Sequence, residues 1–163
     1  MCSTVTQEPE IAESYIEATF DMAAQAAQRG DRPCGSLLVV DETIRGRDTN
    51  RVNSENDLAF HPELSLVRQL ERQLTEREQQ RAVLYTTIEP CSMCAAAITY
   101  TNLSNVVYSV SGERYWELAA QSHSVPDDYI GCTEVFDRME HDVNVVGSVL
   151  ENEGLAVVRD CLE

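Results

Sequence analysis

The sequence contains no lysine, and all twelve of its basic residues are arginines. Twenty-eight aspartates and glutamates outnumber them, so the formal net charge is −16 at pH 7. A uniformly acidic surface repels phosphate backbones, which argues against tight binding of duplex or transfer RNA at ordinary salt. No apolar run approaches the ~18 residues of a membrane-spanning helix, so a transmembrane protein is excluded as well.

The acid-rich, lysine-free composition resembles that of proteins from salt-loving organisms, whose surfaces work in concentrated salt. At about 1 M salt the Debye length falls to ~3 Å, which weakens the repulsion from nucleic acid. A high-GC genome that prefers arginine codons is the alternative explanation for the missing lysines. We favour the halophilic interpretation.

Six cysteines are enough for three disulfides, but free thiols are the better interpretation. No basic and apolar leader opens the sequence, so we expect a cytoplasmic protein whose cysteines stay reduced. A chain of 163 residues also buries a core without crosslinks, and we expect one domain over 1–163. The pair Cys91 and Cys94 then indicates metal or redox chemistry, and Cys34 is expected to be buried beside a sheet.

Hydrophobic periodicity switches between strand-like and helical segments along the whole chain. Helices are predicted over 8–29, from 61 to about 74, and over 91–100, 112–121 and 149–161. Strands are predicted over 35–41, 43–48, 82–87, 105–110 and 143–146, with a loop over 122–131. Because strands alternate with helices, we expect an α/β fold: a three-layer α-β-α sandwich around a mixed, five-stranded central sheet.

Two short motifs carry the chemistry. His61-Pro62-Glu63 opens one predicted helix, and Cys91-Ser92-Met93-Cys94 opens another thirty residues later. Because Cys91 and Cys94 are three residues apart on a helical turn, both sulfurs face one side. Two thiolates and one imidazole are good ligands for Zn²⁺, and they leave the fourth tetrahedral position free for water. An open site of this kind is a catalytic design.

Glu63 lies two residues after His61, where it can sit beside a bound water without coordinating the metal. Zinc lowers the pKa of such a water from 15.7 to about 7, and two helix N-termini favour thiolates and hydroxide there. We therefore expect Glu63 to take the proton from the water and deliver it to a substrate nitrogen. The alternative is a closed, structural zinc site whose fourth ligand is one of three residues: Cys34, His123 or Cys132.

The combination of H-x-E with P-C-x-x-C is the signature of the zinc deaminases. Over roughly 8–150 the chain resembles the cytidine deaminase-like superfamily, and within it the nucleoside and nucleobase deaminases, including guanine deaminases, and the tRNA adenosine deaminases. The resemblance is carried by three features: Pro33-Cys-Gly-Ser-Leu-Leu-Val, Asn50 and Tyr85-Thr-Thr-Ile-Glu-Pro-Cys-Ser-Met-Cys-Ala-Ala-Ala-Ile. It implies the following site: His61, Cys91 and Cys94 as ligands of one Zn²⁺, Glu63 as the catalytic proton shuttle and Asn50 in the substrate pocket.

The resemblance implies hydrolytic deamination of a free nucleobase or nucleoside, with release of ammonia. A guanine-type purine is slightly preferred over cytosine or cytidine, which would place the enzyme in purine metabolism. The alternatives are a tRNA adenosine deaminase and a zinc-stabilised binding module without catalysis. Residues 139–163 hold a single arginine, so no basic tail supports a nucleic-acid partner. Family members commonly form homodimers through the helix after C-x-x-C, and Ala95-Ala96-Ala97 suits close packing there.

The sequence departs from the family at two places. Pro62 stands where the family has Ala, Gly or Val, and it lacks the backbone N–H that bonds the substrate in several members. The chain ends without the aromatic residues that close over the pocket of guanine deaminases, so a lid must come from elsewhere. Trp116 follows the strand predicted over 105–110, where the family's specificity elements lie; we expect it in the core, with stacking on the base as the alternative. Asn50 and Glu89 also have structural interpretations: Asn50 as the cap of a turn, and Glu89 as an acceptor for backbone N–H groups at a helix start.

Overall fold

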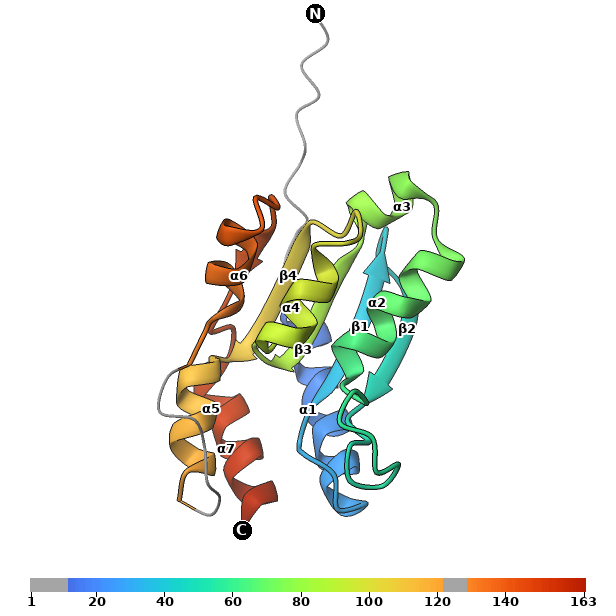
Figure 1. Cartoon of the computed structure of the whole chain (residues 1–163). Helices are drawn as coiled ribbons and strands as arrows, with labels where there is room; N and C mark the ends of the chain where they lie inside the picture. The colour runs from blue at the N-terminus through green and yellow to red at the C-terminus, as the bar shows by residue number, and fades with distance from the viewer. Residues whose placement is uncertain (1–11, 122–128) are drawn as a thin grey trace, which may run out of the picture.

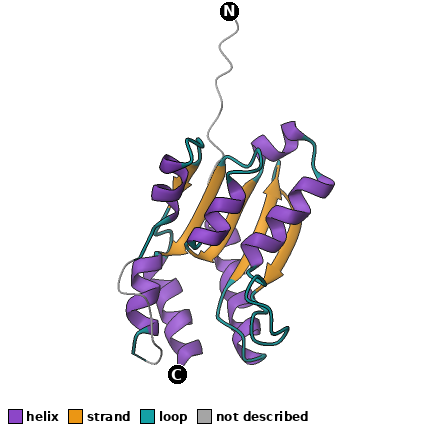
Figure 2. Ribbon diagram, in the orientation of Figure 1, coloured by secondary structure: helices purple, strands orange, loops and turns teal. Residues whose placement is uncertain are grey.

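Five strands form one mixed sheet at the centre of the computed structural model, which describes residues 12–121 and 129–163 (Figures 1 and 2). The strands are β1 (Gly35–Val40), β2 (Thr43–Thr49), β3 (Val83–Ile88), β4 (Asn105–Val110) and β5 (Asn144–Val146). They are ordered β2-β1-β3-β4-β5 across the sheet. β1 is antiparallel to β2 and β3, whereas β3, β4 and β5 are parallel. The predicted α/β fold with a mixed sheet is confirmed.

Helices cover both faces of this sheet (Figure 1). The described residues form α1 (Glu13–Gln28), α2 (Pro62–Gln73), α3 (Glu76–Arg81), α4 (Ser92–Ile98), α5 (Gly112–Ala119), α6 (Cys132–Arg138) and α7 (Glu151–Leu162). α1 and α7 pack together on one face, while α2 and α4 pack on the other with α6 beside α4. α5 lies against α7. The result is the three-layer arrangement that the sequence predicts.

All residues of β1 and β3 are buried, because helices cover both faces of these neighbouring strands. Their side chains alternate between the two layers. Leu38 and Leu84 join the hydrophobic cluster beneath α2 and α4. Leu37 and Tyr85 join the cluster beneath α1. The two strands therefore give a rigid base to the loops and helices that start at their ends.

Two short helices, α3 and α6, are absent from the sequence prediction. Thr75 and Glu78 form a reciprocal capping box that starts α3. α6 follows Gly131, which offers no side chain for capping. The helix predicted from residue 8 is described from Glu13 onward, and residues 122–128 of the predicted loop lie outside the described residues.

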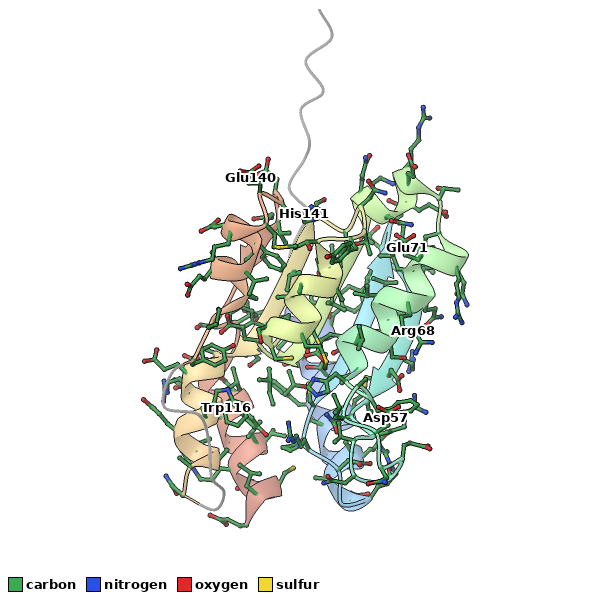
Figure 3. All side chains as sticks on the ribbon, viewed as in Figure 1. Asp57, Arg68, Glu71, Trp116, Glu140 and His141 are labelled. Carbon is green, nitrogen blue, oxygen red and sulfur yellow. The ribbon has the colours of Figure 1, made fainter. Side chains whose placement is uncertain are left out.

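Figure 3 shows the side chains of the described residues, among them Arg68 and Glu71, which are exposed on α2. His141 is half-buried, and its Nε2 lies 3.2 Å from the carbonyl oxygen of Leu103. Among the described residues, none of the helices combines the length and the apolarity that a bilayer crossing requires. The homodimer through α4 stays a prediction, which light scattering can test. Tyr100, two residues beyond the end of α4, is 80% exposed.

Candidate active site

His61 and Cys91 are the residues that immediately precede α2 and α4. Both have extended backbones, with φ/ψ of −83°/138° and −66°/170°, and neither side chain caps its own helix. Pro62 takes the first helical position, where its missing N–H costs no hydrogen bond. The imidazole and the thiol are therefore free to act as ligands at two neighbouring helix starts.

The candidate metal ligands lie at the spacing that a zinc ion requires. Nδ1 of His61 lies 3.6 Å from Sγ of Cys91. Tetrahedral bonds of normal Zn–N and Zn–S length would set these two atoms about 3.5 Å apart. The ligand atoms of His61, Cys91 and Cys94 all fall within 4.8 Å of one another. In the described part of the chain, neither Cys34 nor Cys132 joins this group, and His123 is not among the described residues.

The surroundings of the two sulfurs, Sγ of Cys91 and Sγ of Cys94, favour the binding of a cation. A hydrogen bond from the Cys94 thiol and the neighbouring His61 imidazole lower the pKa of Cys91 to about 4. The same hydrogen bond, together with burial, raises the pKa of Cys94. A divalent metal at this position would stabilise both thiolates. The donor set fits Zn²⁺ in number, type and charge.

Glu63 is the buried carboxylate beside these ligands. Glu63 is only 3% exposed, and burial raises the pKa of its carboxyl to about 7. Oε2 lies 4.0 Å from Sγ of Cys94, whereas Oε1 accepts a hydrogen bond from Oγ1 of Thr86 at 3.3 Å. A carboxyl with a pKa near neutrality can both take up and release a proton.

A pocket opens beside Glu63, and its empty space, including the mouth, is about 530 Å³. We define its metal wall as His61, Glu63 and Cys91. We define its aromatic wall as Gly112, Tyr115, Trp116 and Tyr129. The remaining lining residues are Arg32, Cys34, Asn50, Ile88 and Glu89.

Trp116 packs against the core, as expected, and also lines the pocket. It is half-buried, stacks edge-on against Tyr115 with 5.4 Å between ring centroids, and lines the pocket (Figure 3). One side of the indole packs on a hydrophobic cluster, and another contributes to the aromatic wall.

Asn50 is 2% exposed and caps a turn, as one of its two interpretations expects; its place in the substrate pocket stays a prediction. Its Oδ1 accepts the backbone N–H of Val52 at 3.1 Å, which caps the turn after β2. Its backbone N–H donates to the carbonyl of Cys34 at 2.9 Å, which fixes the residue beside the start of β1. Within the described residues Nδ2 has no hydrogen-bond partner, so the amide can donate to a molecule in the pocket.

Two buried carboxylates support the site from outside its motifs. Glu89 accepts the N–H of Gly112 with Oε2 at 2.9 Å and the N–H of Cys132 with Oε1 at 2.8 Å. Glu89 therefore links the starts of α5 and α6. It acts as an acceptor at helix starts, as one interpretation of the sequence expects, but for α5 and α6 rather than for α4. Asp31 accepts the N–H groups of Asn53 and Ser54 and anchors the loop that follows Asn50. No motif or spacing in the sequence marks Asp31.

Residues 9–110 match the family described as cytidine and deoxycytidylate deaminase zinc-binding region. A probable cytosine deaminase of Schizosaccharomyces pombe is 28% identical over 156 residues, covering 95% of this chain and 93% of the relative. A tRNA-specific adenosine deaminase of Agrobacterium fabrum is 32% identical over 129 residues, covering 74% and 84%. The structure of a guanine deaminase from Nitrosomonas europaea superposes with a TM-score of 0.72 at 14% identity, covering 95% and 86%, a likeness of fold alone.

Proposed function

Because the chain belongs to the cytidine and deoxycytidylate deaminase zinc-binding family, it is a zinc-dependent aminohydrolase, and we propose the roles of its residues. His61, Cys91 and Cys94 hold one Zn²⁺ ion, and Glu63 is the catalytic acid and base. The observation that carries the proposal is the buried Glu63 carboxylate beside the three clustered ligands.

Zinc bound at these ligands supplies Lewis-acid activation of a water molecule. Glu63 takes a proton from that water and passes it to a ring nitrogen of the substrate. The water oxygen bonds to the amine-bearing ring carbon. Glu63 then moves the remaining proton of that oxygen to the amine, the C–N bond breaks, and an oxo product and ammonia leave. The pKa of about 7 suits both directions of transfer.

The substrate we propose is a free nucleobase or nucleoside. The pocket beside Glu63 has three aromatic residues in its lining, Tyr115, Trp116 and Tyr129. Aromatic side chains offer a face for a planar ring, and Asn50 Nδ2 offers a donor for a ring nitrogen or carbonyl. The sequence favours a guanine-type purine, while the S. pombe relative supports cytosine, so both bases belong at the head of a substrate panel.

A tRNA adenosine deaminase is the second candidate, supported by the 32% identity to the A. fabrum relative. The net charge of −16 opposes it, because each phosphate contact would have to overcome long-range repulsion. Concentrated salt screens that repulsion, so tRNA is included in the panel at both low and multimolar salt.

Ammonia release from bases, nucleosides, nucleotides and tRNA tests the proposal directly. We expect E63Q to bind one zinc per chain and to lose about 10²- to 10⁴-fold in kcat, the usual contribution of a general acid and base. E71Q, which changes an exposed residue of the same helix, is the matched control and should keep full activity. A zinc-loaded wild type that deaminates nothing in the panel, or an active E63Q, contradicts the proposal; the first result favours a binding module.

A further inference from the structure

Two hydroxyl side chains face Glu63 from the sheet. Ser36 and Thr86 are directly paired across the antiparallel strands β1 and β3, so their side chains leave the sheet on the same side. Strand alternation places them on the face that Leu38 and Leu84 share, beneath α2 and α4. Both are fully buried. Polar side chains thus replace aliphatic ones at the part of this face that adjoins Glu63.

The hydrogen bonds of these hydroxyls run in one direction. Oγ of Ser36 donates to Oγ1 of Thr86 at 2.8 Å, and Oγ1 of Thr86 donates to Oε1 of Glu63 at 3.3 Å. A hydroxyl has a single proton to donate. Because Thr86 accepts from Ser36, its own proton is free to point at the carboxylate; Sγ of Cys34, 3.7 Å from Oγ1 of Thr86, is the other group near this hydroxyl.

The two oxygens of Glu63 therefore have different surroundings. Oε1 faces the sheet, where the Cys34 thiol also lies 3.8 Å away. Oε2 faces the metal ligands, 4.0 Å from Sγ of Cys94. The last torsion of a glutamate side chain is soft, so the hydroxyl bond to Oε1 restricts a rotation that would otherwise be nearly free.

We propose that Thr86 is a positioning residue of the deaminase: its hydroxyl, oriented by Ser36, anchors Oε1 of Glu63 so that Oε2 carries the proton. The inference rests on the proposed role of Glu63. Thr86 touches neither the substrate nor the metal ligands in this scheme and acts through the carboxylate alone. A misplacement of about 1 Å in a reacting group costs up to about 100-fold in rate.

The sharpest variant is T86V, which removes the hydroxyl and keeps the β-branched shape. We expect its kcat to fall about 10- to 100-fold, with KM and zinc content unchanged. T86S restores the hydroxyl and should recover most of the wild-type kcat. T87V is the matched control: the hydroxyl of Thr87 is equally buried one residue along β3, but it donates to the carbonyl of Thr19 at 3.0 Å. Folded, zinc-loaded T87V should keep the wild-type kcat.

A crystal structure of zinc-loaded T86V supplies a readout besides activity. We expect the Glu63 carboxylate to have turned away from residue 86, and to be restored in T86S. Wild-type kcat in T86V, or an unmoved carboxylate, overturns the inference. If T86V does not fold, S36A takes its place: it leaves Thr86 in position but without its orienting donor, and an unchanged kcat again overturns the inference.

The outcomes separate this inference from the proposed function. An active E63Q means that Glu63 is not the proton shuttle, and the proposed function fails. An inactive E63Q combined with a fully active T86V leaves that function in place and removes only the role of Thr86.

Discussion

The metal wall of the pocket is built on regular structure, since His61 and Cys91 precede helices that pack on the fully buried strands β1 and β3. The aromatic wall has a different base: α5 follows β4 and packs on α7, and Tyr115 lies in a buried cluster with Ile88 and Val110. Glu89 links the starts of α5 and α6 by accepting one backbone N–H from each. The difference suggests two tasks: the central strands hold the proposed reacting groups, and Glu89 helps to hold the surface that we expect to meet the substrate. Variants of either wall should therefore change different kinetic constants.

Removing a metal ligand should have the largest effect. C94S replaces a buried thiolate ligand with a hydroxyl, which is a poorer donor for zinc at neutral pH. We expect zinc below one ion per chain and a loss of activity of about 10³-fold or more, because the ion contributes several kcal/mol to the transition state. Metal analysis and ammonia release measure both quantities. C161S, at a half-buried thiol outside the ligand group, should match the wild type, and a C94S protein with full zinc and full turnover would refute the assignment.

The aromatic wall should respond through substrate binding instead. In E89Q only one oxygen remains to accept, and the new NH₂ group faces a backbone N–H, so one buried donor loses its partner. We expect the free energy of unfolding to fall by about 1–3 kcal/mol, KM to rise and the zinc content to stay at one per chain. Denaturant melts and steady-state kinetics measure the three effects.

E113Q is the control for that variant, because Glu113 lies exposed in the first turn of the same α5 helix. It should leave KM and stability near their wild-type values. An E89Q protein that loses zinc while its KM is unchanged would show that the two walls are not independent, and the comparison between them would fail.

The metal wall could be predicted from the sequence because its ligands are encoded locally, by H-x-E and C-x-x-C at predicted helix starts. The support of the aromatic wall could be predicted only in part: Glu89 is expected to accept N–H groups at a helix start, but the groups that it reaches lie 23 and 43 residues further along the chain. No periodicity marks such a contact. The pairing of Ser36 with Thr86 is equally hidden, because it depends on the register of strands 50 residues apart.

The two missed helices differ in the same way. The Thr75-x-x-Glu78 pattern is a capping box that could have revealed α3. α6 follows Gly131 without a side-chain cap, so it carried no start signal. Three-dimensional packing, rather than local sequence, accounts for it.

A smaller effect is expected at Asp31, whose fully buried carboxylate holds the loop after Asn50. It accepts backbone N–H groups of Asn53 and Ser54 at 3.0 and 2.8 Å, and the Ser54 hydroxyl at 2.8 Å. D31N should cost about 1–2 kcal/mol in the free energy of unfolding at pH 7, because the amide cannot accept all of these bonds. Zinc content should stay unchanged, since none of the hydrogen bonds of Asp31 reaches His61, Cys91 or Cys94.

The pH dependence of the stability lost in D31N tests whether the charge of Asp31, rather than the shape of its side chain, holds the loop. Burial alone would raise the pKa of Asp31, but the hydrogen bonds from Ser54, the charge of Arg29 and the N–H of Asn53 together hold it below its usual value. A carboxyl with a depressed pKa in the folded state contributes its full stability above the unfolded pKa of about 3.9. That stability is lost as the pH falls through the lower folded value. Thermal melts of wild type and D31N from pH 7 to pH 3 should therefore converge below about pH 4, and a gap that stays constant over this range would mean that the Asp31 charge does not hold the loop.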